Sequence, residues 1–246
     1  MMKTRDFDTL VAHLRDLQLK SELWNTCICS NFLEEAEQTK LLPLFPESSC
    51  LYYFGGYKGA MKKKVIFSPM GEDGFSDIVC LKAKIDQRFR KIGHKDVLGA
   101  LMSLQVERSS FGDFWIENDA IYLYTSEDMV SFFEQHLTQV NQLRIHWERL
   151  TDYPVYERAF REFEVIVASY RIDAMVSALM KTSREKAKHQ IQAGQVSVNH
   201  EMIEDAGKLC HNGTTISIRG CGRFQFIEII RRTKSGRLVA HMKQYI

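Results

Sequence analysis

The side chains with the clearest chemical potential in this sequence are basic and polar residues clustered in its last third. Arg184 and Lys188 lie one turn apart in a helix predicted over residues 184–193, so they share one face. Two like charges at this spacing repel each other, and an anion placed between them turns that repulsion into attraction. A guanidinium can hold a phosphate through two parallel N–H contacts, whereas an ammonium acts as a point charge. The pattern therefore predicts a phosphate-binding surface.

Other candidate ligands surround this pair. Thr182 or Ser183 is expected to cap the helix, and its hydroxyl and the first N–H groups offer donors to an anion. The full set of candidate ligands for a phosphate-rich polymer such as RNA comprises Arg171, Lys181, Thr182, Ser183, Arg184, Lys188, His189, Asn199 and Lys208. The apolar residues interleaved with them are predicted to be core: Ala187, Ile191, Val196 and Val198.

A second basic stretch precedes a helix predicted over residues 95–104. Its candidates for a second RNA contact are Arg90, Lys91, His94 and Lys95. His94 and Asp96 are two residues apart and no nucleophile accompanies them, so an RNA contact is favoured over acid–base chemistry. The lysine run at 62–64 is expected to be solvated. The tyrosines at 52, 53 and 57 are expected in a core rather than stacked on bases.

No spacing in the sequence predicts a metal, a cofactor or a catalytic centre. Cys27 and Cys29 form a CxC pair rather than the paired CxxC motifs of a zinc ribbon. Cys210, His211 and Cys221 match no established ligand spacing. The phosphate-loop GxxxxGKS/T, Rossmann, HExxH and GxSxG patterns are all missing from the sequence. We therefore expect no catalytic residue, no metal site and no cofactor.

Length and composition describe an ordinary globular chain. Its 246 residues are 45% hydrophobic and 26% charged, and no run approaches the ~18 apolar residues of a membrane span. The first ten residues lack the apolar stretch of a secretory signal, and six cysteines are too few for a disulfide scaffold. These features predict a cytoplasmic protein that stays off the membrane, and we expect a monomer.

The net charge of +2 hides an asymmetry along the chain. Residues 169–246 hold 13 Lys and Arg against 6 Asp and Glu, a net charge of +7, whereas the first 168 residues have a net charge of −5. A basic last third on a mildly acidic body predicts an anionic partner for that third.

Periodicity predicts an α+β protein in four parts. The N-terminal part, 1–74, is expected to be helical to about residue 49, with Asn31 as a candidate cap and a hairpin of strands 51–57 and 64–67. The second part, 75–150, shows the ferredoxin-like order β-α-β-β-α-β. Its elements are expected at 77–85, 95–104, 112–117, 120–125, 126–139 and 143–149.

A connector, 151–168, leads to the fourth part, 169–246. Ser169 is expected to cap a first helix ending near Leu179, and helix 184–193 is expected to end at Gly194 in the left-handed region. Asn199 and His200 are expected to form a turn. Strands are expected at 196–198, 215–219, 224–230 and 238–242.

This fourth part resembles the S-four-type RNA-binding domain, also called the alpha-L motif. The resemblance rests on RID at 171–173, SR at 183–184, Ala187, Ile191, Gly194 and VSVN at 196–199. It implies two short helices and a following strand that grip structured RNA. His200 departs from the pattern, because the family usually has Gly after the asparagine. Histidine tolerates the left-handed region less well than glycine does.

The whole chain resembles the bacterial YlmH family. That resemblance adds GHKDVLGALMSLQVERSSFGDFWI at 93–116 and LYYFGGY at 51–57 to the C-terminal motifs. It implies a non-enzymatic cytosolic factor that binds large-subunit rRNA and tRNA on the large ribosomal subunit. The family is associated with ribosome-associated quality control of subunits obstructed by peptidyl-tRNA, and its genes often neighbour division genes.

Two other function classes stay open at the level of sequence. One is an RNA-modifying enzyme, because S-four-type domains often accompany pseudouridine synthases. Those enzymes usually place this domain first and a catalytic domain after it, whereas here it comes last. The other is a division-linked interaction scaffold in which the basic module is incidental.

Overall fold

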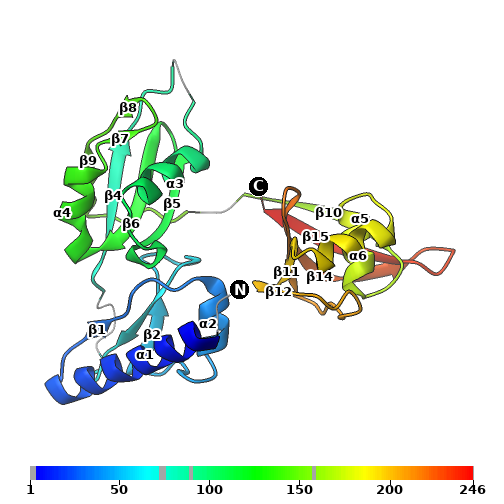
Figure 1. The fold of residues 1–246 in the computed structure, drawn as a ribbon, viewed down its shortest axis with the longest axis horizontal. Coiled ribbons are helices and arrows are strands. Elements are labelled where there is room, and N and C mark those ends of the chain that lie inside the picture. Colours follow the sequence, from blue (N-terminus) through cyan, green and yellow to red (C-terminus); the bar gives the residue numbers. More distant parts are fainter. Residues whose placement is uncertain (1–3, 72–75, 89–90, 157–158, 246) are drawn as a thin grey trace. The chain divides into compact units, whose positions relative to one another are not determined.

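The structure is a computed structural model that describes residues 4–71, 76–88, 91–156 and 159–245 (Figure 1). Contacts between residues divide the chain into two compact units that meet between positions 156 and 157. This division falls inside the predicted connector, whereas the predicted boundary at 74–75 lies outside the described residues. Among the residues that are described, no helix is both long and apolar enough to cross a membrane.

The N-terminal region of the first unit packs a long helix against a small antiparallel sheet. Leu14 of the helix is fully buried among Val65 and Phe67 of the sheet and Phe45 of the loop that precedes the second strand. The strands are ordered β1-β3-β2. The elements are α1 (Thr4–Trp24), β1 (Ile28–Cys29), α2 (Glu35–Leu41), β2 (Leu51–Phe54) and β3 (Lys64–Phe67).

The hairpin of strands β2 and β3 confirms the prediction, and α1 and α2 are the helical stretches expected before it, but the helical assignment of residues 28–33 was wrong. Residues 28–33 run extended alongside β3, where Ser30 N donates to Val65 O and Leu33 N donates to Lys63 O. These long-range bonds override the local helical pattern. Asn31 is consequently not a cap, and α2 begins after Glu34, whose N–H donates to the Glu37 carboxylate at 2.7 Å.

The central part of the first unit has the predicted ferredoxin-like topology. Its sheet is ordered β5-β6-β4-β9 with every neighbouring pair antiparallel, so each helix connects two strands that are separated by a third. The elements are β4 (Ile78–Lys84), α3 (His94–Ser103), η1 (Arg108–Ser110), β5 (Phe111–Glu117), β6 (Ala120–Ser126), α4 (Glu127–His136), β7 (Gln139–Val140), β8 (Leu143–Arg144) and β9 (Trp147–Arg149). Helix α4 ends three residues before the predicted position, where Trp147 Nε1 donates to Leu137 O.

Both faces of this sheet are covered. Helices α3 and α4 pack on the face that carries Val79, Leu81 and Leu123. The opposite face carries an aromatic cluster in which Trp115 stacks with Tyr122 and with Tyr156, at ring-centroid distances of 5.2 and 5.0 Å. The cluster is completed by residues from the N-terminal region, by Tyr156 of the connector and by Leu150 just before it; the N-terminal residues are Phe32, Tyr57 and Ala60.

Two lysines join the N-terminal region to the ferredoxin-like sheet, so the prediction of a solvated lysine run was wrong. Lys62 Nζ donates to the backbone carbonyls of Arg108 and Phe111, and Lys64 Nζ contacts the Asp77 carboxylate at 2.7 Å. Both lysine side chains are less than a tenth exposed. Lys62, two residues before β3 begins its pairing at Lys64, and Lys64 itself both turn toward the ferredoxin-like region, which the charge pattern alone could not reveal.

The second unit is a six-stranded antiparallel sheet with two helices on one face. Strand order is β10-β15-β14-β13-β11-β12, and the helices bury Ile172, Val176, Ala187 and Ile191 against the sheet. The elements are β10 (Phe160–Val167), α5 (Ile172–Leu179), α6 (Arg184–Gln192), β11 (Val196–Val198), β12 (Glu201–Met202), β13 (Thr215–Ile218), β14 (Gly222–Arg232) and β15 (Leu238–Tyr245).

Three details of this unit correct or refine the sequence-based expectations. The predicted connector contains β10, which pairs along its whole length with β15. Ser169 is not the cap of α5, because residues 170–172 bond to the loop 208–210 and delay the helix until after Arg171. Gly194 has the expected positive φ, 66°.

Candidate nucleic-acid interface

The helix pair α5–α6 presents most of the residues predicted to bind RNA. Ser183 caps α6 as predicted, since its side chain accepts the N–H of Lys186 at 3.3 Å. Lys181 holds the turn between the helices in the left-handed region, with φ of 51°. Ser177 Oγ donates to Thr182 O at 2.6 Å across the same turn. These bonds fix the backbone from which the basic side chains project.

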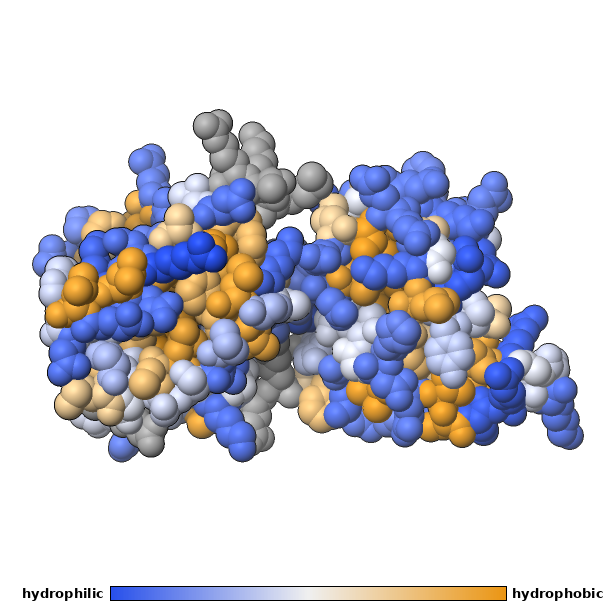
Figure 2. Space-filling model, turned by 90° about the horizontal axis from the view of Figure 1, so that it is seen from below, coloured by the Kyte–Doolittle hydropathy of each residue, from blue (hydrophilic) through white to orange (hydrophobic). Residues whose placement is uncertain are grey.

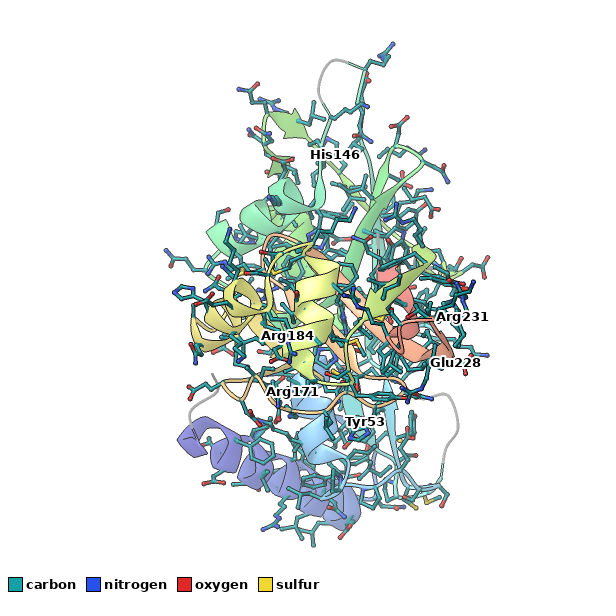
Figure 3. All side chains as sticks on the ribbon, turned by 90° about the vertical axis from the view of Figure 1, so that its right-hand side faces the viewer. Tyr53, His146, Arg171, Arg184, Glu228 and Arg231 are labelled. Carbon is teal, nitrogen blue, oxygen red and sulfur yellow. The ribbon has the colours of Figure 1, made fainter. Side chains whose placement is uncertain are left out.

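A buried carboxylate organises two of the predicted arginines, Arg171 and Arg184, which are labelled in Figure 3. Asp173 is fully buried, and Arg184 Nη2 lies 2.8 and 2.9 Å from its two oxygens. Arg171 approaches the same carboxylate through Nε at 3.3 Å and Nη2 at 3.2 Å. The two guanidinium groups are each a little under half exposed. One carboxylate thus holds two cations side by side at the protein surface, and the trio keeps a net charge of +1.

The electrostatics of this trio favour its ionised form. Burial alone raises the pKa of the Asp173 carboxyl, but the hydrogen bonds from Arg171 and Arg184 outweigh it and hold that pKa below its ordinary value. The same hydrogen bond raises the pKa of Arg171. The carboxylate therefore acts as a fixed anchor at neutral pH, and the remaining guanidinium N–H groups stay available as donors.

This geometry changes the basis of the Arg184–Lys188 prediction. The anion that faces Arg184 is the Asp173 carboxylate of the chain itself, so an external phosphate has to bind to the outward edge of the guanidinium. Lys181, Lys188, His189 and Lys208 are all exposed. Their roles in RNA binding, like that of Arg184, stay predictions.

Asn199 serves the hairpin between β11 and β12. Its Oδ1 accepts the N–H of Thr215 at 2.9 Å, which ties the turn to β13, and its role in RNA binding stays a prediction. Asn199 and His200 both have positive φ, 49° and 69°, as a two-residue hairpin turn requires. Arg223 Nη2 lies 3.1 Å from the His200 ring, a contact that glycine could not make.

The second predicted contact lies at the start of α3. Gly93 N donates to the Asp96 carboxylate at 2.8 Å, so Asp96 caps the helix rather than pairing with a catalytic histidine. His94 stacks on Phe114 at 4.2 Å, and burial, helped by the charge of Arg108, lowers the pKa of His94. Lys91 and Lys95 are exposed, and Arg90 lies outside the described residues. A contact with RNA here stays a prediction.

Burial keeps three of the cysteine thiols in their protonated form. Burial raises the pKa of Cys29 and of Cys80 to about 12 and that of Cys210 to about 11. Within the part of the chain that the structure describes, no group of three or more His, Cys, Asp or Glu side chains is arranged to hold a metal ion.

The organising residue of this interface, Asp173, was absent from the predicted set. A carboxylate has the same negative charge as a phosphate, so a search for phosphate-binding residues by charge does not select it. The available signal was the spacing in RID: an acid two residues after a basic helix cap lies at the first turn, within reach of the arginine before it.

Comparisons with known proteins show which domain families the two regions match. Residues 71–153 match the family model of the YlmH RNA-binding domain, and residues 171–216 match that of the S4 domain. The chain is 28% identical over 213 residues to the ribosome-associated protein quality control protein P2 of Bacillus subtilis (strain 168), covering 83% of this chain and 82% of that protein. The solved structure of the cell division protein ylmH from Streptococcus pneumoniae aligns with a TM-score of 0.45 and 16% identity, over 61% of this chain and 92% of that one.

Proposed function

Because this chain belongs to the YlmH family of RNA-binding proteins with a C-terminal S4 domain, we propose that it is a non-enzymatic factor that binds large-subunit rRNA on the ribosome. It then acts in ribosome-associated quality control in the cytoplasm, on large subunits that carry peptidyl-tRNA. The quality-control role rests on the name of the Bacillus subtilis relative. The RNA-binding role rests on the two matched domains and on one structural observation.

That observation is the pair of arginines anchored by the buried Asp173 beside a capped helix. Phosphate oxygens are bound best by guanidinium groups whose orientation is fixed in advance. Arg171 and Arg184 come from different helices, and one carboxylate aligns both. Lys188 and Lys208 extend the positive charge on exposed positions. The arrangement suits structured RNA, which proteins recognise largely through its phosphates and shape.

Sedimentation of the tagged protein through sucrose gradients tests this proposal. We expect the wild type to travel with free large subunits and the R184A/K188A variant to stay at the top. A control variant, R15A/K58A, removes one arginine and one lysine from exposed positions of the first unit and should sediment like the wild type. Probing the large-subunit fractions for tRNA linked to nascent chains tests the peptidyl-tRNA part.

A second variant separates binding from folding. Removing Arg184 also removes a partner of the buried Asp173, so R184A/K188A can lose its fold as well as its contacts. The K188A/K208A variant changes two exposed lysines and should fold normally while binding more weakly. A wild type that stays at the top of the gradient at low salt contradicts the ribosomal role. A K188A/K208A variant that binds like the wild type contradicts the assigned face.

A further inference from the structure

The positive charge of the second unit lies mostly outside its S4 match. Residues 171–216 hold six Lys and Arg against five Asp and Glu, a net charge of only +1. Residues 217–246 hold seven Lys and Arg against the single acid Glu228, a net charge of +6. The feature that first suggested an anionic partner therefore belongs to the last two strands and the turns at their ends.

The densest part of this charge is the tip of the hairpin formed by β14 and β15. The tip sequence, RRTKSGR at 231–237, carries four cations in seven residues. Its turn is closed by Thr233 N donating to Arg237 O at 2.8 Å and by Gly236 N donating to Thr233 O at 2.9 Å. Gly236 has a φ of 79°, which suits glycine. The cations therefore project from an ordered turn.

The hairpin tip stands clear of the rest of the second unit. Strand β13 pairs with β14 only as far as Gln225, so the last part of β14 has β15 as its neighbour. Figure 1 shows the hairpin extending past the helices, and the space-filling view shows that end of the unit as hydrophilic (Figure 2). The side chains of Arg231, Arg232, Lys234 and Arg237 are exposed.

Most of this charge is not neutralised within the unit. Arg231 forms a two-pronged pair with Glu164, at 3.1 and 2.6 Å (Figure 3 labels Arg231). No ion pair of Arg232, Lys234 or Arg237 with an acidic side chain is found among the described residues. Three cations on a short, ordered turn thus face solvent together.

The tip lies at the same end of the sheet as the arginine pair. Leu238, just after the tip, pairs with Val167 at the end of β10. Only four residues further along the chain, Arg171 immediately precedes α5 and contacts Asp173. The hairpin tip and the α5–α6 face can therefore meet one extended anionic ligand.

We propose that the tip of the β14–β15 hairpin is a second phosphate-binding site, which grips the RNA backbone beyond the S4-type face. This inference rests on the proposed RNA-binding function and extends its footprint. RNA fits better than a lipid surface, because the turn residues Thr233, Ser235 and Gly236 offer no apolar side chain for insertion. Phosphate contacts of this kind strengthen binding without selecting a base sequence.

The test compares two variants with the same charge change. R232Q/K234Q/R237Q neutralises the tip, and R161Q/R219Q/K243Q neutralises three cations at the opposite end of the same sheet. Binding of the full chain to a fluorescent RNA hairpin of about 20 base pairs, and to purified large subunits, is measured at several salt concentrations. Each phosphate contact adds about one to the salt slope, so the tip variant should lose about three. Between 50 and 200 mM salt the wild-type affinity should fall about 40-fold more than that of the tip variant.

The outcomes separate this inference from the proposed function. A flattened slope in the tip variant, with the control variant unchanged, supports a site at the tip. Equal weakening of both variants shows a general field and overturns the site. A wild type that binds RNA while the tip variant matches it overturns the inference alone. A wild type that binds neither the RNA hairpin nor the large subunits overturns the proposed function as well. Tip-dependent binding to vesicles of anionic phospholipid, with RNA binding unchanged, assigns the tip to a membrane surface instead.

Discussion

Replacing Asp173 by Asn tests whether a single buried carboxylate organises the RNA-binding face. The substitution keeps the size of the side chain and removes its charge. It also replaces one acceptor oxygen by an NH2 group that points donors at the donors of Arg171 and Arg184. The net charge of the protein rises by one, which by itself favours RNA binding. Loss of arginine alignment acts in the opposite direction, so the sign of the change is informative.

The size of the stability loss follows from four N–H contacts to the carboxylate. Two are short, at 2.8 and 2.9 Å, and two are long, at 3.2 and 3.3 Å. Asn can accept at one oxygen only, so at least two contacts are lost. Hydrogen bonds to charged groups contribute about 1.5–3 kcal/mol each, but partial exposure of both arginines screens them. We expect a loss of about 2 kcal/mol in the free energy of unfolding of the second unit.

The tryptophans provide an internal control for this measurement. Trp24, Trp115 and Trp147 all lie in the first unit, so tryptophan fluorescence reports unfolding of that unit alone. A loss of about 2 kcal/mol in a unit of about 90 residues lowers its midpoint by roughly 10 °C. Calorimetry of D173N should show that shift while the fluorescence transition stays in place. Hydrogen exchange of peptides over 171–193 locates the loss.

The matched variant for RNA binding is E185Q. Glu185 is an exposed acid in the first turn of α6, and its neutralisation changes the net charge by the same amount as D173N. We expect E185Q to bind RNA slightly more tightly than the wild type and D173N to bind more weakly. Equal tightening in both variants would refute the alignment argument, as would a D173N stability change below about 0.5 kcal/mol.

Three further predictions concern stability. The advantage of wild type over D173N should be complete above about pH 5 and should shrink as the pH falls below the unfolded value near 3.9. That sign follows because the folded-state pKa of Asp173 is lowered, and acid unfolding of both proteins checks it. K64M should lower the free energy of unfolding of the first unit by about 2 kcal/mol, measured in urea. This loss is smaller than that for breaking a fully buried ion pair, because Asp77 is partly exposed. The control K58M changes an exposed lysine and should alter the free energy of unfolding little. G59A should lower the free energy of unfolding by about 1 kcal/mol, because Gly59 has a φ of +89° with open space around it. G56A should lower it by about 3 kcal/mol, because its Cβ would lie 2.4 Å from the Tyr124 ring. Equal urea midpoints for the two variants would contradict the clash at Gly56.

Local signals in the sequence were reliable where short-range chemistry decides the structure. The Asn118–Asp119 turn has positive φ at both residues, as a tight hairpin between alternating strands requires. Ser183 marks the start of α6 because its hydroxyl accepts a hydrogen bond from a backbone N–H of the first turn. Gly194 follows the end of α6 because glycine adopts the left-handed backbone conformation found there. Ala187 and Ile191 are buried, as their spacing predicts. The order of the central strands also follows from this local pattern and from the fixed topology of split β-α-β units.

Long-range pairing accounts for the failures. Residues 28–33 look helical in isolation, but their backbone partners Lys63 and Val65 lie 30 to 35 residues away in the sequence. Lys62 and Lys64 look solvated until the carbonyls of another segment surround them. In the candidate site, Lys181, Lys188, His189 and Lys208 are exposed, as a contact with RNA requires. The carboxylate that aligns Arg171 and Arg184 was missed, because its partner Arg184 lies 11 residues away on another helix.

The aromatic cluster on the ferredoxin-like sheet decides how this domain can meet a nucleic acid. RNA-recognition modules of this topology stack two or three bases on aromatic side chains of the open sheet face. Here Trp115 is already stacked against Tyr156, and Tyr57 packs on it from the N-terminal region. Tyr153 OH donates a hydrogen bond to Ile78 O, and Tyr124 OH donates one to Pro154 O. These two bonds hold the start of the connector against the sheet. The sheet face on which bases would stack is therefore covered by side chains of the protein itself. Any RNA that reaches this domain has to approach the helices or the loops instead.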